Sequence, residues 1–250
     1  MEVLLTGASG GVAGLLAPPD GWRRTDRVAG PGIVEGDLAD LMVAASLMAG
    51  IDTVVHLAGQ ADPDVAWPDL RSPNADVVVN VLDAAVQAGV SRVVLASSLH
   101  AMAGYVDAGA SLVREDQPPH PCCPYGAVKV LGEALGRVYA DQWGLRVICL
   151  RLGGVRERPL GRSWLAGWLS PGDLRRLVGA ALTADVRYGV YHGVSANSGS
   201  VWDTTLARAE LGYAPRDDSL AYADDVPDDL LRTDVVDPAQ RPRWGLAHRS

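Results

Sequence analysis

Short apolar runs alternate with longer amphipathic segments over the first 150 residues of the chain. The apolar runs predict strands at Val3–Leu5, Trp22–Asp26, Thr53–Leu57, Arg92–Ala96 and Leu145–Leu150. The amphipathic segments predict helices at Ala13–Leu16, Leu41–Met48, Asn74–Ala88 and Tyr125–Gln142. Strands that are apolar along their whole length suit a sheet covered on both faces. The alternation therefore predicts an α/β fold with a doubly wound parallel sheet and helices on both faces.

The pattern loosens after Arg151, where Gly- and Pro-rich connections become frequent. This part predicts a helix at Pro171–Thr183, a strand at Tyr188–Val194 and a short helix at Thr204–Leu211. From residue 216 the chain is acidic and has little periodicity, which predicts a surface segment or partial disorder. We therefore divide the chain into a core of residues 1–155, a small portion of residues 156–215 interleaved with it, and an acidic tail of residues 216–250.

Charge and cysteine usage narrow the class of protein. The formal net charge of −8 argues against a general nucleic-acid binder, and no apolar run reaches membrane-spanning length. The first residues are typical of a core strand rather than a leader segment. Cys122, Cys123 and Cys149 are odd in number and show no metal-ligand spacing or matching histidines. We expect reduced thiols, no metal site and a cytoplasmic location.

A glycine-rich turn follows the first predicted strand and begins the first predicted helix. Its spacing is G-x-x-G-x-x-A, and the turn residues expected to bind a ligand are Gly7, Ser9, Gly10, Gly11 and Val12. Glycines let the backbone N–H groups approach a pyrophosphate, and a helix N-terminus favours the anion. A tight structural turn is the alternative. The position between a strand and a helix favours dinucleotide binding by a Rossmann-type sheet.

Asp26 ends the second predicted strand, where a carboxylate accepts hydrogen bonds from the adenosine ribose hydroxyls. A carboxylate there repels a 2′-phosphate and favours NAD, although the neighbouring Arg23, Arg24 and Arg27 leave NADP open. Two further segments, at Asp37-Leu38 and at His56–Gly59, each follow an apolar run, at the rim where we expect a bound adenine and its phosphates to lie. As alternatives, Asp37 caps a helix and Gly59 forms a simple turn. The rim residues are Asp37, Leu38, Leu57, Ala58 and Gly59.

Lys129 is the single lysine among 22 basic residues. It stands four residues after Tyr125 in a predicted helix, so both side chains lie on one face. A neighbouring ammonium lowers the pKa of a phenol, so Tyr125 can act as a general base while Lys129 holds the nicotinamide ribose. Arginine replaces lysine poorly where a compact charge is needed. The alternative is an incidental pair on a solvated helix.

Ser97 and Ser98 follow the fourth predicted strand, at the edge where open parallel sheets bind ligands. We expect Ser98 to orient the substrate oxygen, with an ordinary strand-end serine as the alternative. Ser98, Tyr125 and Lys129 are therefore the candidate catalytic residues.

Together these residues resemble the extended branch of the short-chain dehydrogenase/reductase superfamily, the NAD-dependent epimerase/dehydratase family, over residues 1–215. The resemblance implies NAD as cofactor and adds Asn74 and Ala96 to the cofactor-binding residues. It assigns residues 1–155, with the Tyr-x-x-x-Lys helix, to NAD binding and residues 156–215 to substrate binding. The carriers are Thr6-Gly7-Ala8-Ser9-Gly10, Asp26, Asp37-Leu38, His56-Leu57-Ala58-Gly59, Asn74, Ala96-Ser97-Ser98 and Tyr125-x-x-x-Lys129.

The chain is most similar to uronate dehydrogenases within this family. The similarity lies in Ser97-Ser98-Leu99-His100, in Tyr125–Glu133, in Trp168-Leu169-Ser170 and in Gly193–Asn197. The substrate positions depart from that pattern. Leu99 stands where uronate dehydrogenases carry an asparagine, while Gly154 and Ala61 each stand where they carry a serine.

The arginine that grips a substrate carboxylate in uronate dehydrogenases falls near Ser163 here, with Arg162 one residue away. Either Arg162 reaches the substrate through a shifted loop, or the arginine that binds the carboxylate is missing. Serine is a poor replacement for such an arginine, because it cannot form the two-point hydrogen bonds to a carboxylate. His100 matches the corresponding histidine of the family and is a candidate substrate-binding residue; a purely structural histidine is the alternative.

The replacement of these polar substrate contacts by Leu99, Gly154 and Ala61 suggests a different and less polar substrate.

The sequence therefore predicts an NAD-dependent oxidoreductase that acts on a hydroxyl of a sugar, sugar acid or related polyol. One alternative is an NAD-retaining epimerase or dehydratase. Another is a non-catalytic nucleotide sensor or scaffold, although such relatives usually lose the Tyr/Lys pair. The resemblance also implies a homodimer, formed through the helices that begin at Asn74 and Tyr125.

Overall fold

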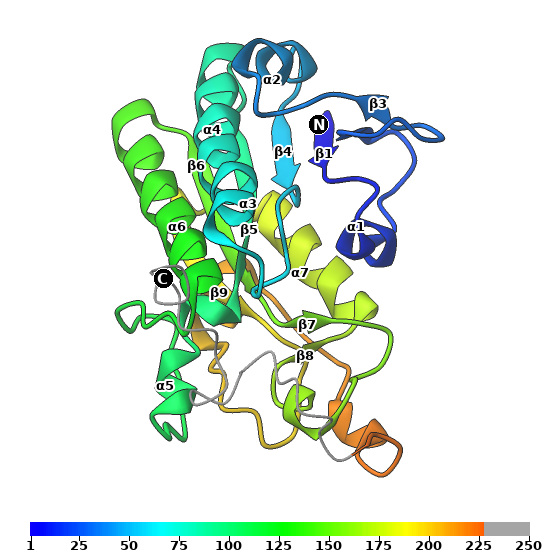
Figure 1. The fold of residues 1–250 in the computed structure, drawn as a ribbon, viewed down its shortest axis with the longest axis vertical. Coiled ribbons are helices and arrows are strands. Elements are labelled where there is room, and N and C mark those ends of the chain that lie inside the picture. Colours follow the sequence, from blue (N-terminus) through cyan, green and yellow to red (C-terminus); the bar gives the residue numbers. More distant parts are fainter. Residues whose placement is uncertain (228–250) are drawn as a thin grey trace, which may run out of the picture.

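Parallel strands build the central sheet of the computed structural model, which describes residues 1–227 (Figure 1). The strands are β1 (Val3–Thr6), β2 (Arg23–Asp26), β3 (Val34–Glu35), β4 (Thr53–His56), β5 (Arg92–Ser98), β6 (Arg146–Leu152) and β9 (Tyr188–Gly193). Their order across the sheet is β3-β2-β1-β4-β5-β6-β9. Strand addition reverses direction between β1 and β4, and such a switch point is where open α/β sheets bind ligands, beyond the carboxyl ends of the strands. A second, two-stranded sheet pairs β7 (Gly154–Val155) with β8 (Trp168–Leu169).

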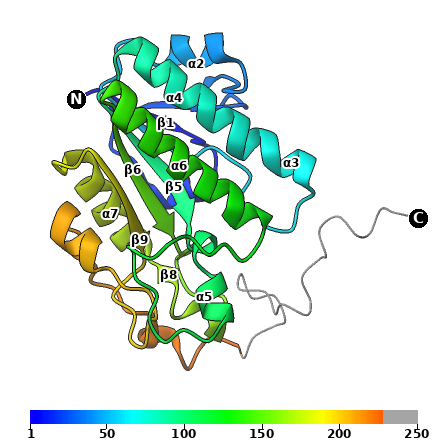
Figure 2. The ribbon, with the colours of Figure 1, turned by 90° about the vertical axis from the view of Figure 1, so that its left-hand side faces the viewer.

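Helices cover both faces of the central sheet, as Figure 2 shows. On one face, α2 (Leu41–Leu47), α4 (Val77–Ala88) and α6 (Pro124–Trp143) bury a cluster around Met48, Val81 and Ala140. On the other face, α1 (Gly11–Leu16) and α7 (Pro171–Thr183) bury a cluster around Leu16, Leu174 and Leu177. The remaining helical elements are α3 (Trp67–Arg71), α5 (Gly104–Asp107), π turns at Ser72–Asp76 and Ala207–Leu211, and 3₁₀ turns at Leu99–Ala101, Arg162–Trp164 and Ser219–Tyr222.

The predicted doubly wound parallel sheet is confirmed, and α7 has its predicted bounds. Strand β5 extends two residues beyond its predicted end, through both serines, and β6 extends to Leu152. Strands β3, β7 and β8 and helices α3 and α5 were not predicted. The three strands have two residues each, too few for a period-2 pattern to be recognised.

The segment before α4 differs from the prediction of one helix over Asn74–Ala88. Helix α3 and a π turn precede α4 and continue into it without a break. Pro68 and Pro73 lie in the first positions of these two elements, where a missing N–H is tolerated. Two prolines five residues apart are typical loop signals, so the sequence analysis placed the start of the helix too late.

The first part of the predicted tail packs on the surface of the folded unit, so the alternative of partial disorder is wrong for this part. The backbone N–H groups of Arg216 and Asp217 donate to Asp173 in α7, and Ser219 is buried. The rest of the tail, residues 228–250, lies outside the described residues. Within residues 1–227, no helix combines the length and the apolar character needed to cross a membrane.

Candidate active site

The glycine-rich turn connects β1 to α1 at the sheet's carboxyl edge. Gly7 has φ +69°, and a Cβ on it would lie 2.6 Å from the backbone nitrogen of Ala58, so only glycine fits between the two turns. Gly10 is the N-cap of α1, without a side-chain cap or an acidic residue in the first turn. The first N–H groups of α1 therefore remain available to an anion.

Asp26 accepts hydrogen bonds from the backbone N–H and hydroxyl of Ser9, at 3.0 and 2.6 Å, and from the N–H of Arg27 at 2.7 Å. Burial raises the pKa of Asp26, but these hydrogen bonds outweigh it, so the pKa lies below its ordinary value. The carboxylate at the end of β2 is thereby held beside the glycine-rich turn.

The predicted rim residues lie beyond the ends of β3 and β4. Asp37 accepts from the N–H of Ala39, whereas Asp40 is the residue that caps α2. Gly59 has φ +153°, and a Cβ on it would lie 2.8 Å from Asn74 Oδ1. Asn74 is buried, and its amide donates to the carbonyls of Gln60 and Leu70. Leu38 is buried in the core, and Leu57 and Ala58 continue from β4 toward Gly59.

The serine pair at the end of β5 separates into two environments, because successive strand residues face opposite sides. The hydroxyl of Ser97 donates to Glu133 in α6 at 2.6 Å, and Glu133 forms a buried two-point ion pair with Arg151 at 2.9 and 2.8 Å. Ser98 instead accepts from the N–H of His100 at 3.2 Å. Ser97 thus ties β5 to α6 through Glu133. Both serines line a cavity, and Ser98 does so without a bond to Glu133.

Tyr125 and Lys129 lie one turn apart in α6. The Lys129 ammonium donates to the carbonyl of Ala96 at 3.1 Å and lies 5.4 Å from the centroid of the Tyr125 ring. Burial lowers the pKa of Lys129 to about 8. Burial and the positive charge of Lys129 lower the pKa of His56 in β4 to about 3, so this imidazole is neutral at pH 7.

One cavity of about 270 Å³ brings the predicted catalytic and substrate residues together. Val12 from the glycine-rich turn, Leu57, Gly59 and Ala96 line it as well, so the expected cofactor cleft and substrate site are continuous. The predicted catalytic and substrate residues on its wall are Ala61, Ser98, Leu99, His100, Tyr125, Lys129, Gly154 and Ser163.

Arg162 is exposed and is absent from the residues that line this cavity, whereas Arg156, directly after β7, lines it. Sequence reasoning missed Arg156, Gln60, Trp164 and Trp202 on the wall. No local pattern marks these residues, because they come from separate loops. Gly154 is explained by one of them: a Cβ on Gly154 would lie 2.3 Å from the Trp164 ring, so the indole fills the space of a serine there.

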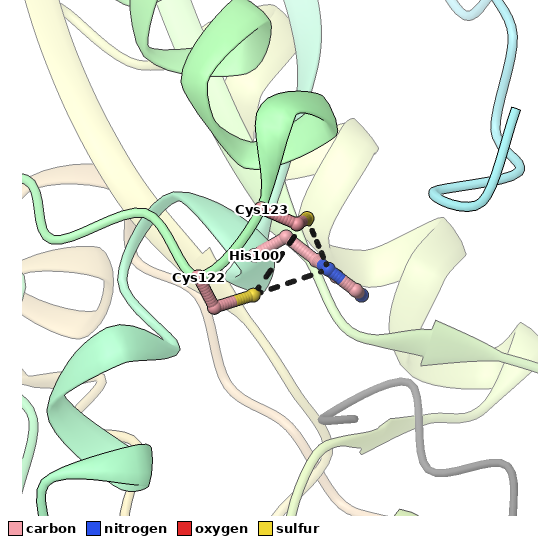
Figure 3. Close-up of side chains that lie close together, drawn as sticks. All are labelled: His100, Cys122 and Cys123. Carbon is pink, nitrogen blue, oxygen red and sulfur yellow. Dashed lines mark hydrogen bonds between the residues drawn. The ribbon is translucent and has the colours of Figure 1, made fainter. Parts of the chain in front are cut away.

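A cluster of thiols and imidazole lies beside the cavity and corrects the expectation that the cysteines have no matching histidine. Figure 3 shows His100, Cys122 and Cys123 pointing toward one another, although 22 residues separate His100 from Cys122. The hydrogen bond from Cys122 lowers the pKa of Cys123; burial opposes it, and the contacts with His100 and Gly126 bring the pKa to about 4. Cys149 lies apart in β6, and the structure contains no disulfide among these three cysteines, all of which it describes.

The residues present fit a dinucleotide. The uncapped first turn of α1 suits a pyrophosphate, the position of a Cβ on Gly11 is open with nothing within 4 Å, and Asp26 offers an acceptor for ribose hydroxyls. The chemistry of the donor set therefore agrees with the cofactor implied by the sequence.

Known proteins resemble this chain in sequence and in fold. The NAD dependent epimerase/dehydratase family model matches residues 4–155. The NAD-dependent glucose-6-phosphate dehydrogenase of Haloferax volcanii is 31% identical, covering 88% of this chain and 95% of the relative. The uronate dehydrogenase of Pseudomonas putida is 32% identical, covering 88% of this chain and 86% of the relative.

A solved structure of a uronate dehydrogenase also matches this chain. The uronate dehydrogenase of Agrobacterium tumefaciens, as a mutant complexed with NAD, matches with a TM-score of 0.83 and 28% identity, over 92% of this chain and 91% of that one. The sheet, the glycine-rich turn and the sequence similarity agree, and this chain belongs to the NAD-dependent epimerase/dehydratase family.

Proposed function

We propose that the chain is an NAD-dependent dehydrogenase that oxidises a hydroxyl-bearing carbon of a sugar or related polyol. The observation that carries this proposal is a cavity in which Ser98, Tyr125 and Lys129 meet Val12 of the glycine-rich turn. NAD, when bound, supplies the hydride acceptor. The related sugar dehydrogenases support this reaction class.

Each catalytic side chain has one role in this proposal. Lys129 is held by the Ala96 carbonyl, and its charge favours the ionised form of the nearby phenol. Tyr125 takes the proton of the substrate hydroxyl. Ser98 orients the same oxygen, because Ser97 is already engaged by Glu133.

The cavity wall favours a neutral sugar over a uronate. Leu99, Ala61 and Gly154 offer no hydrogen bonds from their side chains, and Trp164 and Trp202 add apolar surface. The exposed Arg156 is the guanidinium on this wall, and it comes from the end of β7 rather than from position 162. Because the apolar positions outweigh this one exposed guanidinium, we propose an aldose-like substrate without a carboxylate.

The test follows NADH absorbance while aldoses, aldose phosphates, uronic acids and cyclitols are offered with NAD. We expect steady NADH formation with a neutral aldose, and a loss of kcat of at least about 100-fold in Tyr125→Phe. Tyr105→Phe, whose hydroxyl donates to Pro118 at the surface, is the matched control and should keep its turnover.

Two outcomes would contradict parts of this proposal. Tightly bound NAD with substrate conversion but no net NADH would mean an epimerase or dehydratase instead. A larger kcat/KM for glucuronate or galacturonate than for neutral aldoses would overturn the assignment of a neutral substrate.

We also propose a homodimer formed through the outer faces of α4 and α6. Leu131 and Val138 are 42% and 41% exposed on α6, and their seven-residue spacing puts them on one face. Light scattering after size exclusion should give twice the chain mass, and Val138→Glu should give a monomer. Leu160→Glu, at an exposed position outside α4 and α6, should stay dimeric.

We place the protein in the cytoplasm, where thiols stay reduced. Three cysteines without a disulfide support this location. Fractionation of the source cells checks it, and recovery in a secreted or periplasmic fraction would contradict it.

A further inference from the structure

Three soft donor atoms converge at the N-terminus of α6. The Cys123 sulfur lies 3.3 Å from His100 Nδ1, the Cys122 sulfur lies 3.5 Å from the same nitrogen, and the two sulfurs are 3.7 Å apart (Figure 3). Among the described residues, this histidine and these two cysteines form a group whose donor atoms all lie within 4.8 Å of one another, close enough to share one ion.

These separations match the edges of a tetrahedral zinc site. With Zn–S bonds of about 2.3 Å and Zn–N bonds of about 2.0–2.1 Å, a tetrahedron places two sulfurs about 3.8 Å apart and a sulfur and a nitrogen about 3.6 Å apart. The three observed distances fall within a few tenths of an ångström of these values. Little movement is needed to admit the ion.

The backbone holds the three donors in place. The N–H of Cys122 donates to the carbonyl of His100 at 3.1 Å, which fixes the two segments side by side. Gly126 packs against the same carbonyl, since a Cβ there would lie 2.2 Å from it. The cluster is therefore preorganised by main-chain contacts rather than by flexible side chains alone.

We propose that His100, Cys122 and Cys123 form a Zn²⁺ site at the N-terminus of the Tyr125–Lys129 helix. Two thiolates and an imidazole are a common ligand set for zinc. The N–H of Gly126 donates to the Cys123 sulfur, which supports the thiolate that binds metal.

The site touches the candidate active site through His100. The His100 ring lines the cavity and lies edge-on to the Tyr125 ring, with centroids 5.4 Å apart. Three protein ligands leave the fourth tetrahedral position for water or another small ligand. Metal occupancy would hold the His100 ring in its position on the cavity wall.

The test measures zinc binding directly and needs neither substrate nor NAD. The full chain is reduced, stripped with a chelator and titrated with Zn²⁺ against a chromophoric competitor. We expect one zinc ion per chain, and a loss of affinity of more than about 100-fold in Cys122→Ser, Cys123→Ser and His100→Gln, because even outer-shell changes cost 10–100-fold. Co²⁺ should give thiolate-to-metal charge-transfer bands that disappear in Cys123→Ser.

The matched controls replace a cysteine and a histidine outside the cluster. Cys149→Ala lies in the sheet core and His120→Gln is exposed, and both variants should bind Zn²⁺ with unchanged affinity. Circular dichroism melting confirms that each variant is folded. Zinc binding that is unchanged in Cys123→Ser, or Cu⁺ binding without Zn²⁺ binding, would overturn the proposal. Either result would leave the dehydrogenase proposal untouched, since the assay contains no turnover.

Discussion

We expect the carboxylate of Asp26 to select between the two nicotinamide cofactors. A 2′-phosphate placed beside it meets a negative charge, while Arg27 stands next to it as a cation. Asp26→Asn keeps an oxygen that accepts from Ser9 but removes the charge. We expect the ratio of kcat/KM for NADP to that for NAD to rise at least about tenfold, or about 1.4 kcal/mol. Asp40→Asn, at the exposed cap of α2, should leave the ratio unchanged, and a rise there would contradict this explanation.

Lys129 should make stability depend on pH in the alkaline range. Its pKa is lowered to about 8, whereas a lysine in the unfolded chain titrates at about 10.4. Between these values the unfolded chain binds more protons, so the free energy of unfolding rises with pH. His56 from β4 and Tyr125 from α6 face the ammonium, and both remain in the comparison variant.

The comparison is with Lys129→Met, which keeps the apolar stem and removes the titration. Urea unfolding without NAD should show a larger rise in stability from about pH 8 to about pH 10 in the unmodified chain than in Lys129→Met. Equal slopes for the two proteins would mean that Lys129 is solvated.

At the scale of elements, α6, which carries Tyr125 and Lys129, packs against the Leu99–Ala101 turn. A Cβ on Gly126 would lie 2.2 Å from the His100 carbonyl, and backbone atoms cannot give way easily. We expect Gly126→Ala to lower the free energy of unfolding by about 1–3 kcal/mol and to reduce kcat.

Gly179→Ala is the control, because Gly179 is exposed in α7 and a Cβ there meets nothing within 4 Å. This variant should gain about 0.5–1 kcal/mol, the usual advantage of alanine over glycine in a helix. Urea unfolding measures both variants. Equal effects would show that the contact with His100 is unimportant.

For the whole molecule, NAD binding should stabilise the folded chain. A ligand that binds only the folded state at 100 times its Kd adds about 2.7 kcal/mol, which raises the Tm by about 5–10 °C for a chain of this size. Scanning fluorimetry measures the shift. Tyr125→Phe should show the same shift while losing turnover, and a shift lost together with turnover would assign Tyr125 to binding rather than catalysis.

Local patterns were enough to predict most of the fold and part of the site. The apolar run at Val3–Leu5, the glycine-rich turn and the four-residue spacing of Tyr125 and Lys129 are all contained within one or two elements. The elements that the sequence analysis did not predict carry no such local pattern. Strand β3 is too short to show a period, and the prolines at positions 68 and 73 hid the helical segment before α4.

Sequence alone determined the doubly wound sheet, the cofactor turn and the Tyr125–Lys129 pair, because these depend on spacings of a few residues. Tertiary structure decided that of the two serines on the cavity wall Ser97 is engaged by Glu133. It also placed Arg156 rather than Arg162 on that wall, and Trp164 in the space beside Gly154. It also brought His100 to Cys122 and Cys123. The reason is physical: these contacts join side chains from separate elements, and only the packing of those elements sets the distances between them.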